Sequence, residues 1–176
     1  MMMPLCSFCI KSGILCQKCQ KKLESGQIGA IDIQVAKILM GLEEKYTALQ
    51  KIQFHNAYEV DGVLAIVVGR GDLAAFRDSN GKLVREIAQQ TGRRVRVMEK
   101  HGDERSFLEE LFAPAVITTI NKIWLPDGTT ETRVILSSRP RRLPVKSRIL
   151  KKMAKQIRGI TLRIAYEDRM ERLIRR

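Results

Sequence analysis

Residues 53–68, QFHNAYEVDGVLAIVV, contain two strand-like runs that meet at a tight turn. The runs cover Gln53–Val60 and Val63–Val68, and Asp61-Gly62 lies between them. An Asp-Gly pair between two apolar runs is a strong signal for a two-residue hairpin turn. We therefore predict a β-hairpin over these residues.

Helical signals lie on both sides of this hairpin. Before it, a helix capped by Asp32 is predicted from apolar residues spaced three to four apart. Its apolar face comprises Val35, Ile38, Leu39, Leu42, Tyr46 and Leu49. After the hairpin we predict a short helix at Asp72–Arg77, a polar turn, a second helix at Lys82–Gln90 that ends at Gly92, and a strand at Arg94–Met98. The predicted order is α-β-β-α-α-β.

The same order of signals returns 66 residues later. Three pairs of segments match: Asp61-Gly62 with Asp127-Gly128, Leu83–Gln90 with Ile149–Gln156, and, after one inserted residue, Val95–Val97 with Leu162–Ile164. The second hairpin is predicted from Ile117–Trp124 and Thr132–Leu136, and the helix Glu104–Phe112 precedes it. Coincidences at nearly one offset indicate a tandem duplication.

The positive charge of the chain is concentrated near its C-terminus. The net charge is +13; residues 139–176 hold 14 Lys and Arg against 3 Asp and Glu, whereas residues 1–138 hold 18 against 16. Phosphate is the commonest partner of such a patch, and a solvated tail or an acidic protein partner is the alternative. No secretory leader or apolar run of membrane length is found, so we expect a cytoplasmic protein.

All four cysteines lie within the first 19 residues, as Cys6-Ser-Phe-Cys9 and Cys16-Gln-Lys-Cys19. Two Cys-x-x-Cys turns facing each other complete a tetrahedron of thiolates, which predicts one zinc ion. Four thiolates leave no open position, so the metal is expected to be structural. Disulfides, redox chemistry and an iron–sulfur cluster are the alternatives, and a cytosolic location or the spacing disfavours each.

One run of residues carries a resemblance to a known family. The run begins at Val67-Val68-Gly69-Arg70-Gly71-Asp72, continues through Asn80-Gly81-Lys82-Leu83-Val84-Arg85-Glu86-Ile87 and ends at Gly92-Arg93-Arg94-Val95-Arg96-Val97. It resembles a KH domain of the prokaryotic, type II order. The tandem pair follows a four-cysteine segment at residues 1–25, called the cysteine head below. Together they are similar to archaeal NusA-like KH proteins that carry a zinc knuckle.

The resemblance implies an α+β chain with four parts. These are a four-cysteine zinc knuckle at 1–25, a KH-like domain at 30–100, a degenerate KH-like domain at 101–166 and a basic tail at 167–176. In this family a G-x-x-G loop clamps a nucleic-acid backbone. The loop falls here on Asp78-Ser79-Asn80-Gly81, where Asp78 replaces the first glycine, and in the second copy on Pro144-Val145-Lys146-Ser147, which has no glycine.

Because both loops depart from the pattern, we expect RNA contacts to lie mainly in the basic C-terminal third. On the predicted helix from Arg148 to Arg158, capped by Ser147 and ended by Gly159, the apolar residues share one face and the cations cover the remaining surface. The predicted RNA-binding residues are Arg70, Ser79, Asn80, Gly81, Lys82, Arg85, Arg139, Arg141, Arg142, Lys146, Arg148, Lys151, Lys152, Lys155 and Arg158.

No catalytic constellation emerges from the sequence, and an enzyme is not expected. Gly69-Arg70-Gly71 lacks the βαβ context of a dinucleotide-binding turn, and His55 and His101 are isolated. Trp124 and Phe112 are interpreted as core residues rather than base-stacking platforms.

Three functions remain open. The first is a non-catalytic NusA-like factor that holds nascent RNA beside RNA polymerase. The second is a ribosomal or ribosome-associated protein docked on rRNA of either subunit. The third is a protein-interaction adaptor whose KH folds have lost RNA binding. The cysteine head could serve any of them as a docking surface through Phe8, Ile14 and Leu15.

Overall fold

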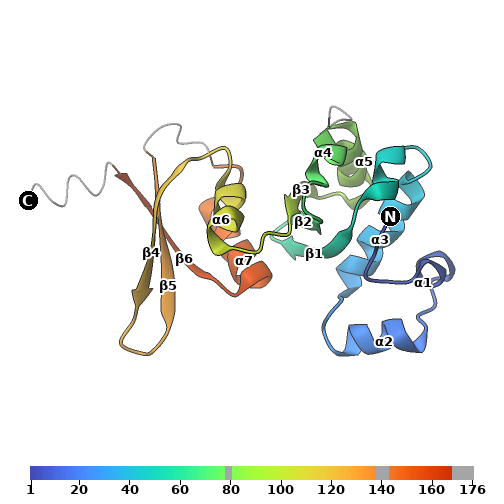
Figure 1. The fold of residues 1–176 in the computed structure, drawn as a ribbon, viewed down its shortest axis with the longest axis horizontal. Helices are drawn as coiled ribbons and strands as arrows, with labels where there is room; N and C mark the ends of the chain where they lie inside the picture. Colours follow the sequence, from blue (N-terminus) through green and yellow to red (C-terminus); the bar gives the residue numbers. More distant parts are fainter. Residues whose placement is uncertain (78–80, 138–142, 168–176) are drawn as a thin grey trace, which may run out of the picture. The chain divides into compact units, whose positions relative to one another are not determined.

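The computed structural model describes residues 1–77, 81–137 and 143–167. Over these residues the fold is mixed α+β, with a four-cysteine cluster near the N-terminus, seven α-helices and two three-stranded sheets (Figure 1). The chain divides into two compact units, Met1–Lys100 and His101–Arg176. The predicted α+β class is confirmed.

The first unit begins with two short helices of the cysteine head and continues into a helix-covered sheet. Its elements are α1 (Ser7–Ser12), α2 (Gln17–Glu24), α3 (Ala30–Leu42), the 3-10 helix η1 (Thr47–Lys51), β1 (Phe54–Val60), β2 (Val63–Val68), α4 (Leu73–Arg77), α5 (Lys82–Thr91) and β3 (Arg94–Glu99). The two head helices were not predicted from the sequence.

The hairpin at residues 53–68 forms as predicted. Asp61 and Gly62 have φ values of 47° and 78°, and positive φ at both central residues is the geometry that matches the twist of a two-residue hairpin. β2 is the central strand, antiparallel to β1 and parallel to β3, and all six of its residues are buried. A parallel neighbour requires a crossover connection, which α4 and α5 supply.

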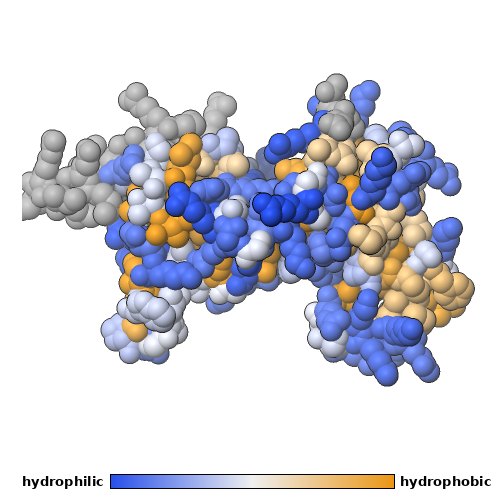
Figure 2. All heavy atoms as spheres, in the orientation of Figure 1, coloured by the Kyte–Doolittle hydropathy of each residue, from blue (hydrophilic) through white to orange (hydrophobic). Residues whose placement is uncertain are grey.

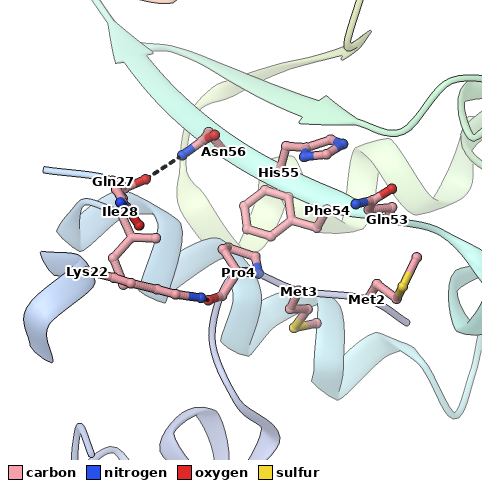
Figure 3. Close-up of a pocket in the computed structure, with 10 residues that line it drawn as sticks. All are labelled: Met2, Met3, Pro4, Lys22, Gln27, Ile28, Gln53, Phe54, His55 and Asn56. Atoms are coloured by element: carbon pink, nitrogen blue, oxygen red, sulfur yellow. Dashed lines mark hydrogen bonds between the residues drawn. The ribbon is translucent and has the colours of Figure 1, made fainter. Parts of the chain in front are cut away.

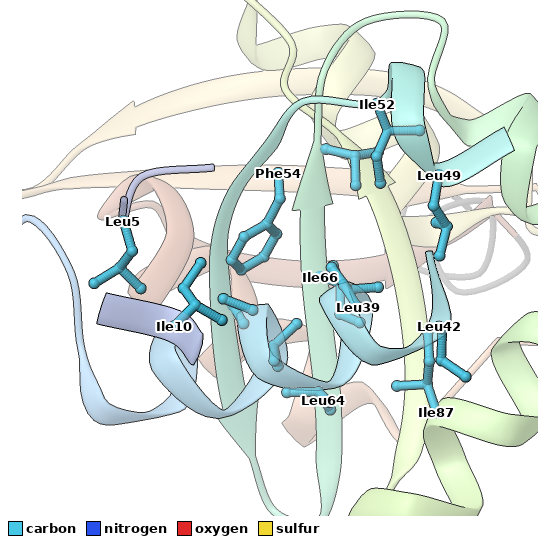
Figure 4. Packing of buried hydrophobic residues seen from close by; sticks show 14 of the residues in the cluster. Leu5, Ile10, Leu39, Leu42, Leu49, Ile52, Phe54, Leu64, Ile66 and Ile87 are labelled. Atoms are coloured by element: carbon cyan, nitrogen blue, oxygen red, sulfur yellow. The ribbon is translucent and has the colours of Figure 1, made fainter. Parts of the chain in front are cut away.

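The core of the first unit lies between α3 and the sheet. Figure 4 shows Leu39 and Leu42 of α3, Phe54 of β1, Leu64 and Ile66 of β2 and Ile87 of α5 gathered in one buried cluster. The cluster extends into the head through the buried residues Leu5, Cys9, Ile10, Cys19 and Ile28. The cysteine head therefore shares one apolar core with the helix-covered sheet.

Asp32 does not cap the helix that it was predicted to begin. The helix starts at Ala30 with Gly29 at the cap position, and Asp32 lies in its first turn. The Asp32 carboxylate is buried and accepts hydrogen bonds from the backbone N–H of Gly29, at 2.6 Å, and of Ala57 in β1, at 2.5 Å. The helix ends at Leu42, so the predicted face residues Tyr46 and Leu49 lie beyond it.

The second unit consists of a smaller set of elements around its own sheet. These are α6 (Glu104–Phe112), β4 (Ile117–Trp124), β5 (Thr130–Leu136), α7 (Ser147–Arg158) and β6 (Thr161–Tyr166). The strand order is β4-β5-β6, with β5 antiparallel to β4 and parallel to β6. Buried residues come from every element: Phe107, Leu108, Leu111, Phe112, Ile117, Val134, Leu136, Leu150, Met153 and Leu162.

The two sheets share strand order and strand direction, and each has a register shift near the start of its first strand. The alignment of the helices differs from the one predicted. α5 ends at Gly92 and α7 ends at Gly159, both with positive φ, and the buried Leu83 corresponds to the buried Leu150. The offset here is therefore 67 residues, so the inserted residue precedes α7 rather than following it.

The predicted order α-β-β-α-α-β holds for the first unit, whereas in the second unit residues 138–142, between β5 and β6, lie outside the described residues. Between β5 and β6 the described residues contain one helix, α7, where two were predicted. Ser147 is the first residue of α7 rather than its cap; Lys146 occupies the cap position, without a side-chain hydrogen bond. The end of α7 at Gly159 is as predicted.

Candidate metal centre and candidate nucleic-acid interface

The four cysteines converge from the starts of two short helices. Cys6 and Cys16 immediately precede α1 and α2, and Cys9 and Cys19 lie in the first turns of those helices. A Cys-x-x-Cys segment at a helix start therefore presents both sulfurs on the same side of one turn. The four sulfurs all lie within 4.8 Å of one another.

The sulfur distances suit a tetrahedral metal. Zinc–thiolate bonds of about 2.3 Å place the sulfurs of a tetrahedron about 3.8 Å apart. The Sγ of Cys6 lies 3.9 Å from that of Cys16 and 3.8 Å from that of Cys19, and the Cys6–Cys9 distance is 3.1 Å. All four are free thiols, and 3.1 Å is far above the bond length of a disulfide, about 2.05 Å. The cluster can therefore hold one metal ion, as expected.

The backbone around the cysteines stabilises negative charge on sulfur. The N–H of Cys19 is the main reason that the pKa of Cys16 falls to about 6. The N–H of Cys16, 3.1 Å from the Cys9 sulfur, lowers the pKa of Cys9, but the neighbouring Cys6 sulfur and burial raise it to about 12. Thiols this close cannot all ionise without a cation between them, and a bound divalent ion would hold all four as thiolates.

The head is fastened to the first strand of the sheet around a cavity of about 430 Å³ (Figure 3). The backbone of Met2 exchanges hydrogen bonds with Ile52 and Phe54, in a parallel bridge at Gln53. Lys22 of α2 donates to the Pro4 carbonyl at 2.7 Å, and Asn56 of β1 donates to the Gln27 carbonyl at 3.1 Å. These contacts order both ends of the head.

The outer surface of the head is divided between apolar and charged side chains. Figure 2 shows hydrophobic spheres over α1 and hydrophilic spheres over α2. Of the three residues predicted as a docking surface, Phe8 and Ile14 are 66% and 70% exposed, whereas Leu15 is half-buried against the core.

The predicted cationic helix forms as α7 and separates its two kinds of side chain. Leu150, Met153 and Ala154 are buried. The exposed cations on and next to this helix are Lys146, Arg148, Lys151, Lys152, Lys155 and Arg158. No acidic residue occurs within Ser147–Arg158. The helix therefore presents a surface of one charge sign, to which a polyanion is attracted.

Arg158 differs from the other cations of α7. Its guanidinium donates to the backbone carbonyl of His101, lies 3.4 Å from that of Asp103, and rests 5.5 Å from the centre of the Phe107 ring. These contacts hold the end of α7 against the start of α6. Arg158 thus has a structural role, and its role as an RNA ligand stays a prediction.

The other predicted RNA-binding residues fall into two groups. Arg70, Lys82 and Arg85 are exposed, and Gly81 occupies the cap position of α5 with a φ of 71°. Ser79, Asn80, Arg139, Arg141 and Arg142 lie outside the described residues. Of the G-x-x-G segment, only Gly81 belongs to the described residues. In the second unit, the described members of the predicted interface lie on and next to α7.

Two residues differ from their sequence interpretation. Trp124, expected in the core, is 77% exposed at the end of β4, whereas Phe112 is fully buried as expected. His101, expected to be isolated, contacts the Glu110 carboxylate through Nε2. Exposure at a strand end depends on how far the covering helices reach, which residue spacing does not reveal.

Comparison with known proteins yields a likeness of fold. Neither a family model nor a curated protein matches the sequence. The crystal structure of APE1850 is similar over 75% of this chain and 96% of its own, with a TM-score of 0.56 and 14% sequence identity. At this identity the likeness concerns the fold alone. Within the described residues, every helix is too short or too polar to cross a membrane.

Proposed function

We propose that this chain is a non-catalytic RNA-binding protein that holds an RNA backbone on the cationic face of α7. The observation that carries the proposal is the separation of charge on this helix. Its exposed surface bears lysine and arginine with no acid between them, while its apolar face is buried in the second unit. A solvated helix face usually mixes charges of both signs, so a surface of one sign indicates a charged partner.

The topology of the two sheets supports the KH interpretation. Each unit has a central strand that is antiparallel to the strand before it and parallel to the strand after it in the sequence. In the first unit the element order α-β-β-α-α-β is that of a type II KH domain. The second unit is the degenerate copy in this interpretation, and its basic helix takes over the contact that a glycine loop makes in the family.

The metal in this proposal is one structural zinc ion. Cys9 and Cys19 are buried, and their side chains belong to the same core as α3 and β2. A closed set of four thiolates leaves no coordination position for a substrate. The ion orders the head against the first sheet, and the head contributes no chemistry of its own.

For the cellular process, a NusA-like role in transcription elongation or termination is the leading candidate. Docking on rRNA as a ribosomal or ribosome-associated protein is its rival, and an adaptor role that uses the exposed Phe8 and Ile14 is a third. Sedimentation of a cell lysate separates these roles. Co-purification with RNA polymerase favours the first, co-migration with ribosomal subunits after a high-salt wash favours the second, and partners insensitive to RNase favour the third.

The RNA-binding proposal is tested by fluorescence anisotropy with a fluorescein-labelled oligouridylate. Reversing two exposed charges of α7 in the double variant Lys151→Glu/Lys155→Glu should weaken binding by more than about tenfold, because phosphate contacts become repulsions. The matched control is Lys18→Glu/Lys21→Glu, which makes the same change of net charge on exposed residues of α2. Equal losses in the two variants would mean that only net charge matters, which would contradict a site on α7.

A further inference from the structure

The one tryptophan of the chain lies in solvent. Trp124 is 77% exposed at the end of β4, next to the turn that leads into β5. An indole ring combines a large apolar face with one N–H donor, and tryptophan is enriched where proteins contact their partners. On its own sheet face its nearest strand neighbours are Lys122 and, across the hairpin, Thr130. The polar neighbours on this face distinguish it from the contiguous apolar patch of a protein-binding site.

The strand register places Trp124 on the face of the sheet that carries the helices. Lys122, two residues earlier and therefore on the same face, forms an ion pair with Glu104 of α6 at 2.8 Å. Thr132, which pairs with Lys122, donates to the same carboxylate at 2.9 Å. Trp124 lies one step further along this face, past the start of α6.

The end of α7 lies at the same end of the second unit. Arg158 contacts the backbone of His101 and Asp103, immediately before α6. The cationic helix, the start of α6 and Lys122 are therefore connected by successive contacts within one unit, and Trp124 follows Lys122 on the same strand face. Asp127 lies in the turn beyond Trp124. Its carboxylate accepts hydrogen bonds from the backbone N–H and the hydroxyl of Thr129, at 2.9 and 2.7 Å.

We propose that Trp124 is a stacking platform for one unpaired base of an RNA strand whose backbone lies on α7. This inference rests on the RNA-binding function proposed above. Cations alone bind paired and unpaired strands alike, because both present phosphates. An exposed indole at the same end of the unit adds a contact that only an unstacked base can make. The site therefore selects single-stranded RNA without selecting a base, since every base has a π-face.

The test compares a single-stranded oligouridylate with an oligoadenylate–oligouridylate duplex of the same length. We expect the emission of Trp124 to be quenched by the unlabelled single strand and to change little with the duplex. In anisotropy measurements, Trp124→Ala should lose roughly 5- to 150-fold in affinity for the single strand and little for the duplex. Trp124→Phe, which keeps an aromatic face, should retain most of the affinity. Circular dichroism checks that the exposed substitution leaves the fold unchanged.

The outcomes separate this inference from the function on which it rests. If Trp124→Ala binds the single strand as the unmodified chain does, while Lys151→Glu/Lys155→Glu does not, then α7 binds RNA and the stacking site is wrong. If neither RNA binds the unmodified chain, the proposed function fails, and the stacking site fails with it. If RNA binds without any change in Trp124 emission, the indole is free for another partner such as a protein, and the inference is overturned.

Discussion

The carboxylate of Asp32 in α3 accepts a hydrogen bond from the backbone N–H of Ala57 in β1, and the same carboxylate accepts from Gly29. It therefore joins the start of the helix to the edge of the first sheet. Burial raises the pKa of Asp32, whereas these two N–H groups lower it. A carboxylate can accept both bonds, but an amide has only one oxygen.

Replacing Asp32 by Asn should therefore destabilise the first unit. The amide NH2 would face a backbone N–H inside the protein, and leaving a buried donor unsatisfied costs about 1–3 kcal/mol in the free energy of unfolding. Urea denaturation followed by circular dichroism measures the change. Glu44→Gln makes the same chemical change at an exposed position near the end of α3 and should shift the midpoint very little. A stable Asp32→Asn variant would contradict the assigned hydrogen bonds.

A second link within the first unit depends on pH. Glu86 of α5 accepts from Lys45 at 2.7 Å and from Tyr46 at 2.9 Å, and these two hydrogen bonds lower the pKa of Glu86. Because its pKa is lower in the folded chain, the link is fully present above the ordinary glutamate pKa, about 4.3, and is lost as pH falls through the lower, folded value. A double-mutant cycle of Lys45→Gln and Glu86→Gln should show coupling at neutral pH and none in acid. Coupling that persists in acid would contradict the ion pair.

The two faces of α7 should respond differently to truncation. Leu150 is fully buried, and Leu150→Ala should cost about 2–5 kcal/mol in the free energy of unfolding, since it removes apolar contacts and leaves a cavity. Lys151, the next residue, is exposed, and Lys151→Ala should change stability by less than about 0.5 kcal/mol. Thermal unfolding of the two variants makes the comparison. Similar shifts in both would mean that the helix is rotated relative to its assigned face.

Removal of the metal should affect more than the head itself. From the sequence, chelation is expected to unfold about the first 25 residues. The structure adds that Cys9, Ile10 and Cys19 pack in one core with α3 and β2. We therefore expect a chelator to increase hydrogen exchange in α3 and β1 as well, and to leave α6 and β5 protected. Elemental analysis of protein prepared without chelators should find one zinc per chain; exchange confined to the head would contradict the shared core.

Features that depend on neighbouring residues could be predicted from the sequence, whereas those that depend on distant contacts could not. The hairpin at 53–68 needs only an apolar run and an Asp-Gly turn, and the convergence of the cysteines follows from their spacing. The partner of Asp32 is Ala57, 25 residues away, so the sequence suggested a helix cap instead. Aromatic residues usually lie in the core, which predicts a buried Trp124. In the structure this residue lies at the end of β4, past the start of α6, and it is exposed.

The amphipathic pattern of α7 was also predictable, because residues three and four apart share a face of a helix. The sequence alone does not fix how α7 aligns with α5. Both helices contain a pair of adjacent apolar residues, so Leu83 can be matched with Ile149 as well as with Leu150. The glycine that ends each helix, Gly92 for α5 and Gly159 for α7, favours the match with Leu150. What the cationic face binds depends on a partner, which no internal contact specifies.

The salt dependence of RNA binding tests the central claim, that α7 holds an RNA backbone, most directly. Each phosphate neutralised on a single strand contributes about −0.7 to the slope of log affinity against log salt concentration, so about five contacts give about −3.5. With the oligouridylate, we expect Lys151→Glu/Lys155→Glu to reduce the magnitude of this slope by about 1.4 or more, and Lys18→Glu/Lys21→Glu to leave it unchanged. A slope that is the same in the unmodified chain and in the α7 variant would contradict the account.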